Sequence, residues 1–441
     1  MNPFDQHFTY RKLLRTTVSP VIMMIFTSIY GVVDGLFLSN FTSKTAFAAV
    51  NFILPYLMLF GGLGFMFGTG GSALIAKTLG EGDSKRANEI FSSLFWVSLL
   101  AGTVSMLVGL LLLRPAAILL GADGALLHDS LIYGRVYLLG VPACVLQFEF
   151  QNLYSTAGKP KLGLCATVAS GGTNILLDAL LVGVFRWGLV GAAFATILSQ
   201  WLGGLIPIFY FGRRNTSLLR LVRTRIDFRA ILKICSNGFS EVVNNLSIST
   251  VGMLYNVQLL HYSGDDGLAA YGVLMYVNFL FTAVFWGYIV GCSPLISYQY
   301  GAQNHTELKS LCRKSLVLIL TYSVLMFAAA EIFAGPVVRL FVGYDPQLME
   351  LTMRGFRIFS MNFLFVGLSI CSSSFFTALN NGGVSALLSF LRTFVFQIAA
   401  ILLLPLFFTV DGIWLSLVAA EFLGATVGSV FILAYRHRYH Y

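Results

Sequence analysis

Charged residues are scarce in this chain. Its 441 residues include 28 Lys and Arg and 19 Asp and Glu, or 11% in total, whereas a soluble domain carries about 25%. Hydrophobic residues make up 57% of the sequence, include 39 Phe, and form long runs such as 46–76, 92–113 and 384–408. Runs of about 20 apolar residues are long enough to cross a bilayer as helices. The composition therefore excludes an ordinary soluble protein and predicts an all-α, multi-pass membrane protein.

Cysteines and long polar loops are also scarce. The six cysteines lie in or beside the apolar runs without metal-site spacing, so we interpret them as packing residues. The loops are short throughout and leave no room for a soluble catalytic domain. The first apolar run lacks the cleavage site of a signal peptide and is long enough to remain as a span. We therefore expect neither an enzyme nor a cofactor.

The apolar runs predict twelve transmembrane helices. The second and eighth are long and rich in glycine, so we expect them to protrude from the bilayer or to bend. The predicted spans are 18–39, 47–76, 92–113, 131–156, 162–185, 189–211, 233–259, 269–299, 311–332, 354–377, 384–408 and 412–435.

The basic residues indicate the orientation of these spans. An even number of spans puts both termini on one side, and twenty of the 28 Lys and Arg lie on that side. One, Arg392, lies within a span, and seven lie on the opposite side: Lys44, Arg114, Arg135, Arg186, Arg339, Arg354 and Arg357. This bias predicts that both termini are cytoplasmic. The net charge of +9 is therefore a topology signal and does not indicate a nucleic-acid partner.

The polar stretch 212–232 divides the chain into two similar halves. "FAAVNFILPY" at 47–56 matches "LAAYGVLMYV" at 268–277, and Gly80 and Gly301 follow at the same offset of 221 residues. We therefore predict an N-terminal six-helix lobe (1–211), a basic cytoplasmic linker (212–232) and a C-terminal six-helix lobe (233–441). Parallel repeats of this kind place a cleft between the lobes, as in a transporter.

Several motifs, in order and at the right spacing, resemble one family. They are "VDGLFLSN" in the first span, "STAGKPK" at 155–161, "NILLDALLV" at 174–182, "GAAFATILSQ" at 191–200, "NGFSEVVNNLS" at 237–247 and "PLISYQYGAQN" at 294–304. Over essentially the whole chain the sequence resembles the bacterial multidrug and toxic compound extrusion (MATE) transporters. The resemblance implies two six-helix bundles in a V shape. It also implies export of amphipathic, often cationic compounds in exchange for H⁺ or Na⁺ across the cytoplasmic membrane of a bacterium.

Two aspartates lie inside apolar spans. Tyr30 and Asp34, and likewise Asn174 and Asp178, are four residues apart and share a helix face. At about 1.5 Å per residue, Asp34 and Asp178 lie about 24 and 25 Å along their spans, and Thr196 lies about 10 Å from the outer end of its span. In a core about 30 Å thick all three fall in the outer half, so they can meet inside the N-terminal lobe.

Such a pair of carboxylates suits ion coupling. Two neighbouring acids favour a shared proton, and with the oxygens of Asn174, Thr196 and Tyr30 they can coordinate Na⁺. The resemblance assigns the cation-coupling site to these positions. Intramembrane acids are usually functional, although a purely structural role for Asp34 stays an alternative, as helix packing does for Tyr30 and Thr196.

The second lobe does not repeat this pair. At the 221-residue offset Asp34 becomes Tyr255 and Asp178 becomes Ala399, while Glu241, Arg392 and Glu421 lie within spans. Glu241 and Arg392 both lie about 12 Å from the cytoplasmic side, so we expect them to form a buried ion pair or to bind a cationic substrate. Some relatives use a further acid in the seventh span, where this chain has Ile248. Glu149, in the fourth span, is a weaker candidate for such roles.

Other functions remain as alternatives. A flippase for lipid-linked sugars, from the same superfamily, would favour a strongly cationic cavity, and only Arg392 lies deep in a span. An intramembrane aspartyl protease needs YD and GxGD motifs, but Asp34 follows Val-Val and Asp178 follows Leu-Leu. We expect a monomer whose partners are membrane lipid and an amphipathic small molecule.

Overall fold

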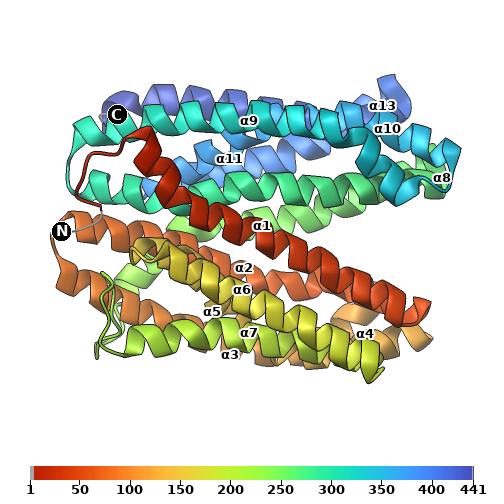
Figure 1. Ribbon diagram of the computed structural model, residues 1–441, viewed down its shortest axis with the longest axis horizontal. Helices are drawn as coiled ribbons and strands as arrows, with labels where there is room; N and C mark the ends of the chain where they lie inside the picture. The colour runs from red at the N-terminus through yellow and green to blue at the C-terminus, as the bar shows by residue number, and fades with distance from the viewer. Residues whose placement is uncertain (1–3, 440) are drawn as a thin grey trace.

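All regular structure in the described part of the chain is helical. The computed structural model describes residues 4–439 and 441 (Figure 1), without the side chains of Ser39, Lys44 and Asp265. The helices are α1 Tyr10–Phe41, α2 Lys44–Gly80, α3 Ser84–Leu119, α4 Gly124–Leu138, α5 Val141–Thr156, α6 Pro160–Leu177, α7 Gly188–Gly212, α8 Phe228–Gly301, α9 His305–Val342, α10 Pro346–Ser360, α11 Phe363–Ala378, α12 Gly382–Phe390 and α13 Gln397–Tyr439, with π-helices η1 Asp178–Val184 and η2 Leu391–Phe396.

These helices make twelve passes through the molecule. Eight helical stretches of the described residues are long and apolar enough to cross a membrane, or ten with two bent pairs. The first arm of α8 and the second arm of α13 supply the other two, because each helix turns back on itself. The all-α, twelve-helix prediction is thereby confirmed.

The turns lie at single residues with left-handed backbone conformations, Gly264 in α8 and Thr409 in α13. Gly238 and Gly301, in the two arms of α8, both lie against α2, so the chain must reverse between them. Asn381, just before α12, donates to the Tyr439 hydroxyl at the end of α13 (2.8 Å). The chain therefore also returns after Thr409.

Two passes bend in the middle. α4 and α5 meet at 58°, and α10 and α11 meet at 45°. The breaks lie near Gly140 and Met361, which the 221-residue offset makes equivalent, so the repeat extends to the bends. The second and eighth passes are instead unbroken stretches of 36 residues. At about 1.5 Å per residue they extend about 54 Å, longer than a bilayer core.

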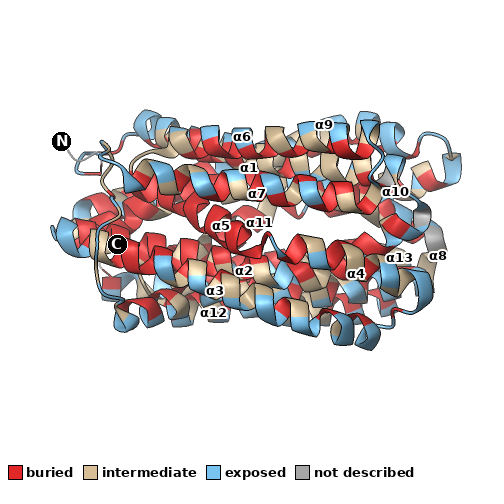
Figure 2. Cartoon of the chain, turned by 90° about the horizontal axis from the view of Figure 1, so that it is seen from below, coloured by how far each residue is buried: buried red, intermediate tan, exposed pale blue. Residues whose placement is uncertain are grey.

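Both termini and the irregular segment 213–227 lie at one end of the molecule, at the left of Figure 1. We call this the N/C end and the opposite one the far end. Within the N-terminal half, α5 is the most enclosed helix: fifteen of its sixteen residues are buried, and it is red along its length in Figure 2. Polar residues on α5 therefore lie in the interior of the protein.

The two halves are packed backbone to backbone at the N/C end. A Cβ atom on Gly80 would lie 2.1 Å from the Tyr298 carbonyl oxygen, and one on Gly301 would lie 2.1 Å from the Lys77 carbonyl oxygen. These two glycines are equivalent in the repeat, so the contact is reciprocal. Only glycine permits so close an approach of two helices.

A second contact of the same kind joins α2 to the first arm of α8. A Cβ atom on Gly70 would lie 2.2 Å from the Ile234 carbonyl oxygen, and one on Gly238 would lie 2.0 Å from that of Met66. By contrast, Gly31 and Gly35 of α1 and Gly252 of α8, all nearer the far end, face open space, with no neighbouring atom within 4 Å. The closest backbone contacts between the halves therefore lie toward the N/C end.

Residues 4–9 form a strap across the N/C end. The strap continues into α1 of the first half, but its contacts are with the second half. Gln299 donates to the Phe4 carbonyl (2.8 Å), and the Phe8 amide donates to Glu307 (2.9 Å). The His7 ring lies 2.7 Å from the same carboxylate. Phe4 and Phe8 are buried. The strap is thus folded onto α8 and α9.

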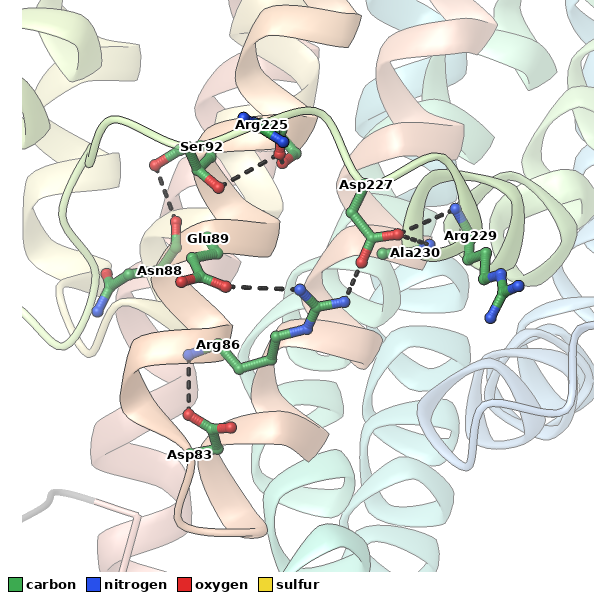
Figure 3. Close-up of polar contacts among 11 residues, drawn as sticks. Asp83, Arg86, Asn88, Glu89, Ser92, Arg225, Asp227, Arg229 and Ala230 are labelled. Carbon is green, nitrogen blue, oxygen red and sulfur yellow. Dashed lines mark hydrogen bonds and ion pairs between the residues drawn. The ribbon is translucent and has the colours of Figure 1, made fainter.

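The segment 213–227 is held along the start of α3 (Figure 3). Arg86 pairs with Glu89 (3.5 Å) and with Asp227, and Asp227 caps α8 by accepting from the Arg229 and Ala230 amides. Burial raises the pKa of Asp227, but these amides and the Arg86 guanidinium outweigh it, so the pKa lies below its usual value. Because of this cap, α8 begins at Phe228, inside the predicted linker.

Candidate functional site

The structure brings the two intramembrane aspartates of the first half together. Asp34 lies on α1, and Asp178 begins η1, which continues α6. Their carboxyl groups lie close enough to interact with each other, and the Asn174 side chain lies close enough to interact with Asp34. The i, i+4 spacings in the sequence thus predict side chains that converge in space.

Several oxygens of this cluster have no hydrogen-bond donor from the protein. One carboxylate oxygen of Asp34, both of Asp178 and the amide oxygen of Asn174 are buried without a hydrogen-bond partner. A buried oxygen left without a donor is costly, so a proton or a cation would satisfy several groups at once. The described residues include no group of three or more His, Cys, Asp or Glu placed to hold a metal ion. A cation here would need the mixed carboxylate, amide and hydroxyl set that the sequence suggests for Na⁺.

Tyr30 lies beside this cluster, whereas Thr196 makes no hydrogen bond to it. The Tyr30 ring packs on α6 at Gly171, where a Cβ atom would lie 2.6 Å from the ring, and its hydroxyl is close enough to Asp34 to interact electrostatically. The Thr196 hydroxyl donates to the Ala192 carbonyl of its own helix (3.0 Å). The oxygen of Thr196 still has a lone pair that could face an ion.

Two further tyrosines lie near the acids. Tyr133 of α4 lies near enough to both carboxyl groups to interact with them, and Tyr137, one turn later, interacts with Asp34 and with the Gln200 side chain. Both tyrosines are buried. Sequence reasoning missed them because they are two of 19 Tyr in a chain rich in aromatic residues. Their i, i+4 spacing, the same as in the two aspartate motifs, was the available signal.

The π-helices coincide with charged residues. Asp178 is the first residue of η1, and Arg392 is the second of η2. The two segments lie on corresponding helices of the two halves, although not at equivalent positions. A π-turn widens the helix and redirects its side chains, and such turns are frequent at functional sites.

In the second half, Arg392 pairs with Glu421 and not directly with Glu241. The Arg392 Nε lies 3.6 Å from Glu421, with both side chains almost fully buried. Glu241 lies farther away, interacting with Arg392 only electrostatically and with the Asn244 side chain directly. The expected Arg392–Glu241 ion pair is therefore corrected to Arg392–Glu421. Similar depth in the membrane did not determine which side of each helix faces the other.

This correction yields a stability prediction. Arg392→Ala should leave the Glu421 charge buried and unpaired, which costs about 3–5 kcal/mol, so folded yield and thermal stability in detergent should fall. Adding Glu421→Gln should restore much of the loss, and adding Glu241→Gln should restore less. Equal rescue by the two glutamines would contradict Glu421 as the partner.

Tyr255, which replaces Asp34 at the 221-residue offset, is buried and stacks on Tyr271 (5.3 Å between ring centroids). The second half thus has an aromatic pair where the first half has an acid. Ile248, at the position where some relatives have an acid, is exposed. The acid pair is therefore restricted to one half.

Comparison with known proteins agrees with this architecture. The family profile described as MatE matches residues 20–180 and 242–403. The chain is 24% identical over 439 residues to the multidrug export protein MepA of Staphylococcus haemolyticus, covering 99% of this chain and 96% of the relative. It is 23% identical over 436 residues to MepA of Staphylococcus aureus strain NCTC 8325, with the same coverage.

Solved structures show the same fold. A crystal structure of MATE in complex with MaL6 superposes with a TM-score of 0.93 at 22% identity, covering 99% of this chain and 98% of the other. The outward-facing conformation of a multidrug resistance MATE family transporter of the MOP superfamily gives the same values. The family profile spans most of both halves. The chain therefore belongs to the MatE family, the multidrug and toxic compound extrusion (MATE) transporters, which are multi-pass proteins of cell membranes and not enzymes.

Proposed function

We propose that this chain is a cation-coupled antiporter that exports amphipathic, mainly cationic compounds across the cytoplasmic membrane of a bacterium. The observation that carries this proposal is the Asp34–Asp178 pair, with buried oxygens that lack protein donors. MepA, the relative at 24% identity, is named as a multidrug export protein, which supports the substrate class. H⁺ and Na⁺ are the two candidate coupling ions, and no resident cofactor is required.

The coupling follows from the free-energy cost of burying Asp34 and Asp178 when no ion is bound to them. Two buried carboxylates without a counter-charge repel each other, so the conformation that encloses them is favoured when a proton or Na⁺ is bound. An ion entering from the far end would therefore promote one conformation, and its release would promote the other. Antiport requires only that substrate and ion favour opposite conformations. Asn174, Tyr30 and Thr196 would supply the remaining oxygens.

We further propose that the N/C end faces the cytoplasm. The excess of Lys and Arg on the side of the termini supports this orientation, as does the basic segment 213–227. The conformation described above, in which the halves are closely packed at the N/C end, would then be closed to the cytoplasm. The protein would act as a monomer, with lipid around it and no nucleic-acid partner.

The flippase alternative is less well supported. Recognition of a lipid-linked pyrophosphate would need unpaired positive charge within the membrane. Arg392, the one basic residue that lies deep in a predicted span, is paired with Glu421. Its charge is therefore not available in this conformation.

The test is export of a fluorescent organic cation in inverted membrane vesicles. The proton and sodium gradients are collapsed separately, with an H⁺/K⁺ exchanging ionophore and with a Na⁺ ionophore. We expect collapse of one gradient to abolish accumulation of the cation and collapse of the other to have little effect. Accumulation that survives the loss of both gradients would contradict ion-coupled antiport. Vesicles carrying Asp34→Asn provide the background.

A further inference from the structure

Glu149 is a buried acid that the Asp34–Asp178 mechanism does not use. It lies on α5, its side chain is fully buried, and neither carboxyl oxygen has a hydrogen-bond partner of good geometry. Ser98 of α3 is close enough to interact with it. On the α2 side the backbone of Glu149 packs against Gly68, whose added Cβ would lie 3.0 Å from the Glu149 carbonyl oxygen.

No counter-charge faces this carboxyl. The helix α5 packs against α2, α3, α6, α7 and α8, and no described Lys, Arg or His nitrogen on any of them lies within 4 Å of the Glu149 carboxyl. The buried Glu421 of the second half, by contrast, is paired with Arg392. A charged Glu149 would have no compensation in this conformation, and an uncompensated buried charge is very costly.

A file of polar side chains leads from Glu149 to the N/C end. Asn152 and Thr156 follow at helical spacing on the face of α5 that packs against α2, and both are buried. The Thr156 hydroxyl lies 2.8 Å from that of Ser72 on α2 and 3.5 Å from the Asn152 carbonyl. Thr156 is the last residue of α5. The file therefore ends where the chain leaves the helical bundle.

The second half of the protein seals α2 beside the end of this file. Asn380 donates to the carbonyl of Ala73, the residue after Ser72 (3.3 Å), and Gly70 packs against the Ile234 carbonyl. Both contacts join the two halves. Parting of the halves at the N/C end would remove both of them and leave Ser72 and Thr156 next to water.

We propose that Glu149 is a second proton-binding site of the N-terminal half, which takes up a proton from the N/C side when that end closes and returns it when that end opens. The proton moves between the Glu149 carboxyl and water that enters past Ser72, Thr156 and Asn152 when that end opens. Uptake and return occur on the same side, so no proton is carried across the membrane. Glu149 makes closure of the N/C end depend on pH on that side.

The direction of the pH effect follows from the number of protons that each conformation binds. The closed conformation binds one more proton than the open one, so raising the pH favours opening. One proton changes the open-to-closed ratio by at most about tenfold per pH unit. The inference rests on the alternating access in the proposed function but not on the Asp34–Asp178 pair as the coupling site.

The experiment measures the conformation directly. Spin labels on α2 and α8 at the N/C end, in protein reconstituted in lipid, report the separation of the two halves between pH 5 and 9. We expect the open fraction to rise with pH in wild type. In Glu149→Gln, which stays neutral, the closed fraction should be larger and this rise should be lost. Glu81→Gln, an exposed and ion-paired glutamate at the same end of α2, is the matched control and should behave as wild type.

The same series in Asp34→Asn separates the two assignments. A rise that persists in Asp34→Asn and disappears on adding Glu149→Gln supports the inference, whatever the transport result. An unchanged rise in Glu149→Gln overturns it and would assign the pH response to other groups at this end.

A second measurement uses only wild-type protein, so it remains informative if Glu149→Gln does not fold. Wild-type protein treated with a hydrophobic carbodiimide, which reacts with protonated carboxyl groups, should be modified at Glu149 more at low pH, as mapped by peptide mass spectrometry. Modification that does not change with pH would also overturn the inference.

Discussion

Asp34→Asn should fold and insert normally but abolish ion-driven export. The amide keeps the size of the carboxyl and can still interact with the Asn174 side chain, so packing on α1 should change little. It cannot hold and release a proton, and it does not balance the charge of Na⁺. Counterflow or gradient-driven efflux in proteoliposomes between pH 5 and 9 is the measurement. We expect accumulation against a gradient to fall to background while substrate binding persists.

Two further variants sharpen this expectation. Asp178→Asn should also impair coupling and change the pH dependence of any remaining transport, because Asp34 then has no second carboxyl with which to share a proton. Asp123 is an exposed aspartate near the far end. Its variant Asp123→Asn is the matched control and should transport like wild type. If Asp34→Asn still concentrates substrate with the wild-type stoichiometry, Asp34 is only a packing residue.

Gly238→Val should prevent closure of the N/C end. A Cβ atom at this position would lie 2.0 Å from the Met66 carbonyl oxygen, and neither backbone can move without separating α2 from α8. Overpacking of this kind costs about 1–3 kcal/mol or more, so the closed conformation should lose at least about fivefold in population. Transport should fall steeply, because the alternation of conformations is blocked at one extreme.

Gly252→Val on the same arm of α8 is the matched control. Its position faces open space, with no neighbouring atom within 4 Å, so the same change in helix propensity occurs without the clash. Spin-label distances across the N/C end should lengthen in Gly238→Val and stay unchanged in Gly252→Val. Unchanged distances and normal export in Gly238→Val would mean that this contact does not control closure.

The acid pair could be predicted from the sequence because helical spacing and depth in the membrane both indicate it. Helical spacing joins Asp34 to Tyr30 and Asp178 to Asn174, and the rise per residue places both acids at one depth. The number of passes and the 221-residue repeat followed from hydropathy and from matched motifs. The repeat even fixes where the two bent passes break, although this becomes apparent only when Gly140 and Met361 are seen at the breaks.

The partner of Arg392 could not be predicted in the same way. Depth is one coordinate, and the rotation of each helix about its axis is another, which hydropathy does not determine in a helix that is apolar on every side. In addition, η2 changes the number of residues per turn at Arg392, so the side chain points away from the direction that regular α-helical spacing predicts. Glu421 was recognised as a candidate but not as the partner.

The strap has a practical consequence for handling the protein. Because Phe4 is buried and its carbonyl accepts from Gln299, an affinity tag fused at the amino terminus would begin only three residues before this contact and would compete for the surface that the strap occupies. The carboxyl terminus is no safer, since the Tyr441 hydroxyl donates to the Ile432 carbonyl and its ring contacts Phe375. A purification handle inserted at Gly121 or Gly343, in connections at the far end that lie outside these contacts, would leave both termini as the native chain folds them.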